Sequence, residues 1–282
     1  MLKPYPQYDN PALYRTLVGA SKYNALQVQL QKRFSDGLSA TASYTFSKAM
    51  DIGGAGNNNG GGGGSTVENI YDIASDYTIS NFDIPHRFTA AFSYELPLGR
   101  GRRFGSGFNR LTNALLGGFQ ITGTASRQSG GPVGLTAPGF GLSYAVRRAN
   151  VVDGVDRSYS ASEIQENIRN GGFAFNPDAF TNPSEFTLGN AARNYSDLRR
   201  DTYKNVDIGI VKNFRFKEDQ KLQLRAEFVN AFNFVVFGTP GRDVSDKDTV
   251  VNGVVTRRGN FGRVTTQGNT PRNIQLVVRY TF

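Results

Sequence analysis

Few residues in this chain could carry catalysis. The 282 residues contain no Cys, and His86 is the only His. A serine-hydrolase triad would have to use that one imidazole, and nothing marks a partner Ser. One His also cannot build a His-rich metal site, and without Cys neither a thiolate metal site nor a disulfide is possible. We therefore expect no enzymatic activity and no cofactor, and we interpret His86 as a structural or rim residue where a strand starts.

Two other patterns could bind small ligands, and both are weak. Residues 53–65 are mostly Gly and Asn. No Lys-Ser or Lys-Thr pair and no helical pattern follow them, which excludes a phosphate-binding loop and favours a flexible loop tip. Four carboxylates could chelate Ca²⁺ but lack EF-hand spacing, so the sequence leaves calcium binding open. They are Asp153, Asp156, Asp246 and Asp248.

The elements that surround these residues are amphipathic strands. In the last ten residues apolar and polar side chains alternate, which places them on opposite faces of an extended strand. The apolar set is Ile274, Leu276, Val278, Tyr280 and Phe282. The alternation recurs over lengths suited to crossing a membrane at a tilt, roughly nine to eleven residues. Other strong candidates are residues 26–34, 38–46, 87–96, 119–126, 206–210 and 222–228, with weaker ones near 132–137 and 260–266.

The connections between these strands differ in length on the two sides. Asp36 and Gly37 predict a tight hairpin turn, and residues 216–221 a short charged turn. Long connections at residues 49–85, 129–203 and 235–272 alternate with these turns. If the first strand runs inward, every long loop falls outside and Phe282 inside, as in outer-membrane barrels. The exception is the inner turn at residues 99–118, which is long for its side. A short helix could form there from Leu111, Ala114, Leu115 and Leu116.

Composition and charge narrow the class further. No apolar run of about eighteen residues exists, so a helical membrane span is excluded. The aromatic residues, 12% of the chain, are all Tyr and Phe, and they cluster near strand ends like interface girdles, although Trp is absent. We therefore predict an all-β fold, an antiparallel transmembrane β-barrel segment. A soluble β-sandwich binding module has the same alternation and remains an alternative.

The net charge of +9 ordinarily suggests a nucleic-acid partner. The distribution of the Arg residues argues against nucleic acid. Arg doublets at residues 147–148, 199–200 and 257–258 fall in the predicted outer loops, where we expect them near anionic lipid head groups. The Gly-Arg-rich inner turn lies between two membrane-type strands, so we interpret it as a solvated basic turn.

Five short motifs lie in or beside the predicted strands. They are residues 23–27 (YNALQ), 44–48 (YTFSK), 83–88 (DIPHRF), 224–233 (LRAEFVNAFN) and 271–276 (PRNIQL). Together they resemble the carboxy-terminal part of TonB-dependent outer-membrane receptors, particularly the Oar-like group with an amino-terminal carboxypeptidase-regulatory-like domain. The resemblance covers most of the chain except the long loops. It implies location in the outer membrane of a Gram-negative bacterium, a barrel of about 22 strands, an amino-terminal plug and a TonB box.

The front of the chain departs from that family pattern. Its first residues do not form a signal peptide, and there is no room for a plug. About seven strands are also fewer than the eight or more of single-chain barrels. We therefore expect residues 1–282 to be the carboxy-terminal part of a barrel domain whose plug and upstream strands are missing. The alternative is a small porin or adhesin-like barrel that closes by oligomerising or by adding the weaker strand candidates.

The resemblance and the loop pattern together suggest sites and partners. As candidate ligand-contacting residues of the outer loops we name Tyr144, Arg147, Tyr159 and Tyr195. The resemblance implies that the final strand is an assembly signal read by the barrel-assembly machinery, through Leu276, Val278, Tyr280 and Phe282. Other expected partners are outer-membrane lipid and lipopolysaccharide, an imported ligand of unknown class, and the TonB system through the missing amino-terminal region.

Overall fold

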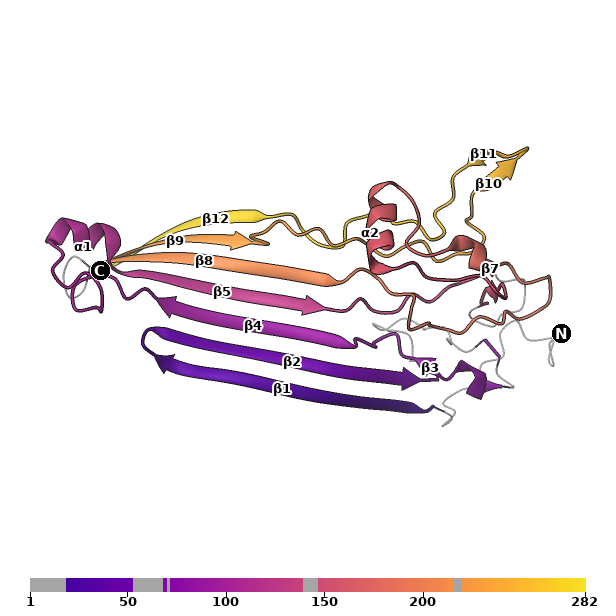
Figure 1. The fold of residues 1–282 in the computed structure, drawn as a ribbon, viewed down its shortest axis with the longest axis horizontal. Helices are drawn as coiled ribbons and strands as arrows, with labels where there is room; N and C mark the ends of the chain where they lie inside the picture. The colour runs from indigo at the N-terminus through magenta and orange to yellow at the C-terminus, as the bar shows by residue number, and fades with distance from the viewer. Residues whose placement is uncertain (1–18, 53–67, 70–71, 139–146, 216–219) are drawn as a thin grey trace.

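The computed structural model describes residues 19–52, 68–69, 72–138, 147–215 and 220–282. Its main element is one antiparallel sheet whose long strands lie side by side in chain order (Figure 1). These strands are β1 (Ser21–Ser35), β2 (Leu38–Asp51), β4 (His86–Glu95), β5 (Phe119–Gln128), β8 (Tyr203–Arg215), β9 (Lys221–Val229) and β12 (Asn273–Thr281). The two-residue strand β3 (Thr78–Ile79) extends the sheet beside β2. Every strong strand predicted from the sequence is thereby confirmed.

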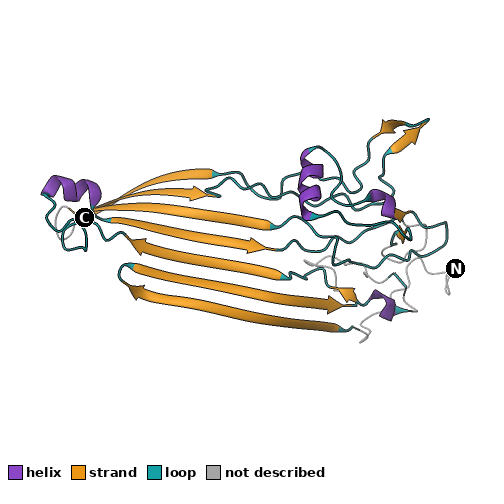
Figure 2. Cartoon of the chain, viewed as in Figure 1, coloured by secondary structure: helices purple, strands orange, loops and turns teal. Residues whose placement is uncertain are grey.

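The shorter elements lie outside this sheet, at its two ends (Figure 2). The helices are α1 (Arg110–Leu116) and α2 (Ala161–Arg169), with short 3-10 turns η1 (Ile73–Asp76) and η2 (Pro177–Ala179). Two small strand pairs complete the set: β6 (Asn150–Val151) with β7 (Phe180–Thr181), and β10 (Thr249–Val251) with β11 (Val254–Arg257). Within the described residues, neither helix is long and apolar enough to cross a membrane.

The register keeps each strand's apolar residues on one common face. Leu26 lies opposite Phe46 between β1 and β2, and Ala226 lies opposite Leu276 between β9 and β12. Between β5 and β8, Ile121 lies opposite Ile210. A slip of one residue at any pairing would move the apolar set to the other face. The continuous apolar face predicted from alternation is therefore confirmed across the whole sheet.

The turns and loops separate as the connection lengths predict. Asp36 and Gly37 form the β1–β2 hairpin with φ of 52° and 81°, and this left-handed geometry is easiest for Gly and tolerable for Asp. Figure 1 places this turn, α1 and the carboxy terminus at one end, which we call the inner end, and the long loops at the other. The predicted turn at residues 216–221 falls mostly outside the described residues. The predicted short helix forms as α1.

The two weak strand candidates do not become sheet strands. Pro132, Thr136 and Ala137 make only isolated bridges, and so do Phe261 and Arg263. These segments belong instead to a packed layer of loops at the outer end. We call it the loop layer, and it comprises the described residues within 68–85, 129–202 and 230–272. The alternation in these two segments reflects burial in this layer, not a membrane crossing.

A hydrophobic core fills the loop layer. Phe180 is fully buried, and its ring meets those of Phe175 and Phe261 edge to face, with centroids 6.1 Å and 6.3 Å away. Edge-to-face contact suits the charge distribution of aromatic rings. The other buried core residues are Val133, Leu135, Ala137, Ala149, Ala179, Ala191, Leu198 and Val244. The loops are thus folded against one another like a small soluble domain.

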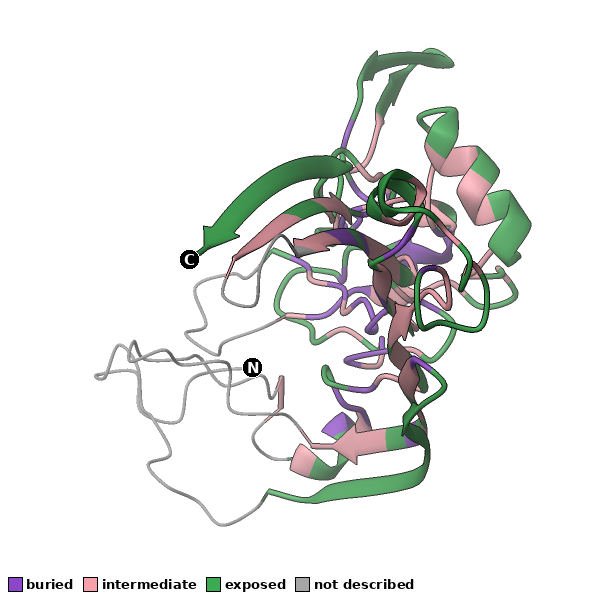
Figure 3. Cartoon of the chain, turned by 90° about the vertical axis from the view of Figure 1, so that its left-hand side faces the viewer, coloured by how far each residue is buried: buried purple, intermediate pink, exposed green. Residues whose placement is uncertain are grey.

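The sheet itself is curved but open. Figure 3 views it end-on and shows the strands following an arc. Within the described residues, each edge strand has one long neighbour: β1 pairs with β2, and β12 pairs with β9. Each edge therefore presents a row of backbone groups that no other strand in the described part of the chain fills.

Candidate transport surface

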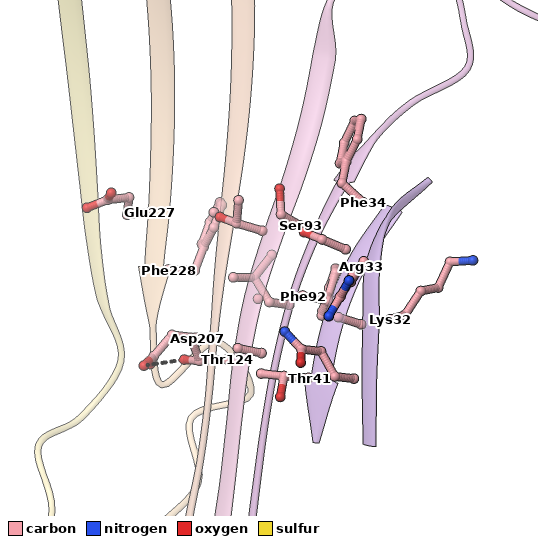
Figure 4. A pocket seen from close by; sticks show the side chains of 18 of the residues that line it. Lys32, Arg33, Phe34, Thr41, Phe92, Ser93, Thr124, Asp207, Glu227 and Phe228 are labelled. Atoms are coloured by element: carbon pink, nitrogen blue, oxygen red, sulfur yellow. Dashed lines mark hydrogen bonds between the residues drawn. The ribbon is translucent and has the colours of Figure 1, made fainter. Parts of the chain in front are cut away.

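The concave side of the sheet is polar. A cavity of about 800 Å³ lies on this side, and polar residues that alternate with the apolar set line it together with apolar residues such as Phe34 and Phe92 (Figure 4). Among them are Arg33, Thr41, Ser93, Thr124, Asp207 and Glu227. The apolar face carries side chains that stay uncovered, with Leu276 and Val278 exposed at 77% and 70%. A sheet with polar side chains on its concave face and an apolar convex face matches a barrel wall between water and lipid.

Two carboxylates stand on the concave face near its outer half. Asp207 accepts hydrogen bonds from the Thr124 hydroxyl at 3.2 Å, the Asn205 amide at 2.9 Å and the Asn230 backbone N–H at 2.9 Å. Glu227 forms an ion pair with Arg225 on the same strand, at 3.0 Å. Both carboxylates have protein partners, and they add hydrogen-bond acceptors to the polar side chains of this face.

His86 lies on the opposite, apolar face at the outer end of β4. Its Nδ1 lies 2.8 Å from the Tyr44 hydroxyl, and its ring is 5.2 Å from the ring of Phe46. The residue is exposed and belongs to an aromatic cluster at the rim. This position agrees with the interpretation of His86 as a rim residue.

A second cavity, of about 370 Å³, lies where the strands meet the loop layer. Gly130, Gly131, Gly238 and Gly268 supply much of its wall. A Cβ atom at Gly130 would overlap the carbonyl of Arg200, so only Gly permits this close approach of two chain segments. The polar side chains at the cavity include Arg200, Asp201 and Tyr203. This group was not predicted from the sequence, although Gly pairs next to strand ends are a signal of close backbone approach.

Buried ion pairs hold the loop layer together, and the pair of Arg193 with Asp51 joins it to the sheet. Arg148 pairs with Asp76, and Arg193 pairs with Asp51 at the end of β2. The Arg199 guanidinium donates to an Asp83 carboxylate oxygen at 2.6 Å. Breaking a buried pair by removing one partner leaves an uncompensated charge, which costs about 3 to 5 kcal/mol. The loops are therefore held in a fixed position above the strands.

These pairs correct one expectation for the Arg doublets. Arg148 and Arg199 do not lie near lipid head groups, because both guanidinium groups pair with buried carboxylates. Arg257 pairs with Asp246 at 2.6 Å. Arg148 and Arg199 were misread because sequence spacing does not reveal that Asp76 and Asp83, from a distant segment, lie beside them.

The predicted ligand-contacting residues lie in or near the loop layer, and none that is described lines either cavity. Tyr144 lies outside the described residues. Arg147 donates to four backbone carbonyl groups: Thr187, Pro138, Pro183 and Ser184. Burial lowers the pKa of Arg147, partly offset by Glu68 and Glu185. The side chain thus holds three loop segments together.

Tyr195 and Tyr159 differ in their surroundings. The Tyr195 hydroxyl accepts the Ala192 backbone N–H at 2.8 Å, and the Arg157 guanidinium lies 4.5 Å from the Tyr195 ring centre. Burial raises the pKa of Tyr195, with smaller opposing effects of the Ala192 hydrogen bond and Arg157. Burial and then Asp178 and Glu163 also raise the pKa of Tyr159, which is half-buried. Tyr195 therefore has an internal packing role, whereas among the described residues no hydrogen bond of this kind holds the Tyr159 hydroxyl.

Two of the four carboxylates considered for calcium, Asp246 and Asp248, accept hydrogen bonds from the protein. Asp246 accepts from the Asn260 backbone N–H and from Arg257, and these hydrogen bonds, the Asn260 bond first, lower its pKa. Asp248 accepts from Arg263 at 3.1 Å and from the Gly259 N–H at 2.9 Å. Both side chains serve to hold the arm that carries β10 and β11.

The final strand forms the sheet's last edge. Its apolar side chains project from the convex face, and Phe282 is 91% exposed. The rings of Tyr280 and Phe282 stack with centres 5.9 Å apart. These residues are positioned to contact lipid or another protein.

A family model described as outer membrane beta barrel domain matches residues 1–275 of the chain. No curated protein and no solved structure matches the chain.

Proposed function

Because the chain belongs to the outer membrane beta barrel domain family and hence to the Gram-negative outer membrane, we propose that it is a barrel segment of a TonB-dependent receptor of the Oar-like group. The loop layer binds a scarce ligand from outside, and the concave face lines part of the path along which the ligand is imported. One observation carries this proposal: a polar concave sheet face ends at a cavity beneath a packed, firmly attached loop layer.

The direction of the edge strands supports a larger barrel over an oligomer of this chain. Six antiparallel pairings lead from β1 to β12, so these two edge strands run in the same direction. A second copy in the same membrane would meet either edge with a parallel strand. To close the sheet into a barrel with antiparallel neighbours throughout, an odd number of further strands must lie between β12 and β1. Added to the seven long strands, an odd number gives the even total typical of bacterial barrels. A larger receptor barrel satisfies this condition, whereas the oligomerising porin does not.

The uncovered apolar face argues against a soluble sandwich. A sandwich buries one face of each sheet against a second sheet about 10 Å away. The described residues contain no second large sheet, and Leu30, Leu276 and Val278 remain at least 70% exposed. Lipid is the solvent that suits such a face.

The charges on the convex face support membrane lipid as a partner. Along the described strands, every charged residue in register with the apolar set is Lys or Arg. At the outer end, Arg127 lies directly opposite Lys204, and the Lys204 ammonium is 5.4 Å from the Phe234 ring centre. Phosphate groups of lipopolysaccharide would neutralise this pair of like charges, which repel each other in the bare protein.

The assembly role of the final strand is also a proposal. An edge strand with free backbone groups and alternating apolar side chains can pair with another sheet's edge. We expect deletion of Phe282 to reduce the amount of protein inserted by the barrel-assembly machinery, without changing ligand affinity per inserted molecule. Quantitative heat-modifiability gels of outer membranes measure the inserted fraction. Normal insertion kinetics after this deletion, or after Phe282→Ser, would contradict the role.

The receptor proposal is tested by the protein found in the outer membrane of its host. Mass spectrometry of protein captured with an antibody against residues 230–272 should yield further barrel peptides, a plug and a TonB box. Site-specific cross-linking should then join that TonB box to the periplasmic domain of TonB. A mature product of only 30.8 kDa, with no plug peptides and no TonB cross-link, would reject the receptor and favour a small barrel.

A further inference from the structure

The inner connection between β4 and β5 is basic and is ordered by its own hydrogen bonds. From residue 96 to residue 118 it contains no Asp or Glu and four Arg residues. Asn109 caps α1 by accepting the Thr112 N–H at 2.8 Å. The Asn113 side chain accepts the Arg100 N–H at 2.7 Å, and the Arg100 guanidinium donates to the Phe108 carbonyl at 2.7 Å. These bonds fix a helix that would be too short to persist alone in water.

Lys212 fastens this helix to the lipid-facing side of the sheet. It lies opposite Phe119 in register with the apolar set, yet it is only 7% exposed. Its ammonium donates to the carbonyls of Leu115 and Gly117 at the carboxyl end of α1. The ring centres of Phe119 and Phe214 lie 4.4 Å and 5.0 Å from the same ammonium. A cation is favourable at a helix carboxyl end and over aromatic faces, so a charge on the apolar face becomes the attachment point of α1.

The attached helix presents apolar side chains that the described chain does not cover. Leu111 and Leu115, one helical turn apart, are 77% and 70% exposed, and Leu116 is 49% exposed. Phe104, in the same connection, is 54% exposed. Transfer of such surface from water to hydrocarbon is favourable in proportion to its area.

The arginines beside these side chains divide into two groups. Arg102 pairs with Glu95 at 2.8 Å, and Arg100 is bonded to Phe108. Within the described residues, Arg103 and Arg110 have no carboxylate partner; Arg103 lies 5.5 Å from the Phe104 ring centre. Free basic side chains next to exposed leucines are the features of a helix that lies at the surface of an anionic membrane.

We propose that α1 and its flanking arginines are an interfacial anchor that docks on anionic phospholipid in the inner leaflet of the outer membrane. Leu111, Leu115 and Leu116 enter the boundary of the hydrocarbon, and Arg103 and Arg110 meet the phosphates. The inner leaflet is specified because α1 lies at the end of the sheet opposite the loop layer (Figure 1). The anchor rests on the membrane location of the chain, not on its role as a receptor.

The absence of Cys allows a depth measurement with single labels. The membrane-inserted protein, carrying a fluorophore at Leu115→Cys, is placed in vesicles of phosphatidylethanolamine and phosphatidylglycerol. Lipids with a quencher just below the head group should quench this label strongly. The matched control is Ser162→Cys on α2, an exposed helical position in the loop layer, which should be unquenched. A label at Val278→Cys should be quenched in every inserted sample and so separates failure of insertion from failure of the anchor.

The requirement for anionic lipid is tested by charge removal. Quenching at Leu115→Cys should fall when phosphatidylcholine replaces phosphatidylglycerol. Arg103→Gln with Arg110→Gln should abolish this lipid dependence, and Arg169→Gln with Arg258→Gln in the loop layer should preserve it. Equal quenching at Leu115→Cys and Ser162→Cys, while Val278→Cys is quenched, would overturn the proposal. Quenching that is independent of phosphatidylglycerol, or shielding of the label by a periplasmic protein in cells, would overturn it as well.

Discussion

The sheet and the loop layer use the same apolar residue types on opposite sides. In the sheet, Leu276 and Val278 point away from the protein and are mostly exposed. In the loop layer, Phe180 and Phe261 are at most 1% exposed and form the centre of a core. One chain is therefore folded against two solvents. The difference teaches that an apolar pattern identifies which side chains avoid water, but not whether protein or lipid covers them.

The two regions also differ in what holds them together. The loop layer is stabilised by buried apolar area and by ion pairs such as Arg148 with Asp76. The sheet has one layer, so its strands are held by backbone hydrogen bonds, which gain importance where no water competes for them. Substitutions should consequently have different effects in the two regions.

The largest expected effect is in the loop core. Phe180→Ala removes a fully buried ring that contacts two others, and we expect the loop layer to lose about 3 to 5 kcal/mol. Leu276→Ala, on the lipid-facing side, should cost far less, because lipid tails fill the space that the side chain leaves. Limited proteolysis of inserted protein in increasing denaturant measures both. If Leu276→Ala were the more damaging change, the assignment of two solvents would be wrong.

The next effect concerns two adjacent valines on opposite faces of β12. Val278→Arg places a charge on the lipid-facing side and should cost about 2 to 4 kcal/mol if the residue lies near the bilayer midplane. Val277→Arg, on the concave side in register with Arg225, should cost much less, because a charge there reaches water. Equilibrium unfolding from phospholipid vesicles compares the two variants. Equal losses would contradict the assigned faces.

A smaller effect should appear at the cap of α2. The Ser160 side chain accepts the Glu163 N–H, and the Glu163 carboxylate accepts the Ser160 N–H at 2.8 Å. Ser160→Ala should destabilise this helix by about 1 kcal/mol. Hydrogen exchange of the α2 amides should quicken, while exchange in the sheet stays unchanged. An equal change in the sheet amides would mean that the two regions unfold together.

The smallest effect is the pH dependence of the same cap. Hydrogen bonds from the Ser160 side chain and then its backbone lower the pKa of Glu163 below the ordinary 4.5. The folded-state pKa is depressed, so the stabilisation is present above the ordinary value and is lost as pH falls through the lowered one. Exchange of the α2 amides, corrected for intrinsic exchange rates, should lose protection over that acidic range. Glu163→Gln cannot titrate and should remove this pH dependence. If the pH dependence persisted in that variant, another group would be responsible for it.

The alternation of residue types determined the strands and their faces. A period-two pattern is local, so β1, β2, β4, β5, β8, β9 and β12 could all be predicted, and so could the placement of the turns. The helix α1 was predicted from its leucines, but its attachment was not. Nothing in the sequence indicates that Lys212 would donate to carbonyls of a helix nearly a hundred residues earlier in the chain.

Tertiary structure alone decided the outer end of the molecule. Phe180 and Phe261 meet only after two loops fold against each other, and Arg199 finds Asp83 across more than a hundred residues. Such contacts are chosen by shape and charge complementarity among distant segments, for which sequence spacing carries no signal. The sequence by itself determined a curved sheet with one face for lipid and one for water, because that choice is made residue by residue along each strand. Whether a loop residue binds a ligand or holds another loop depends on its neighbours in space, and for Arg147 and Arg148 only the folded structure supplied them.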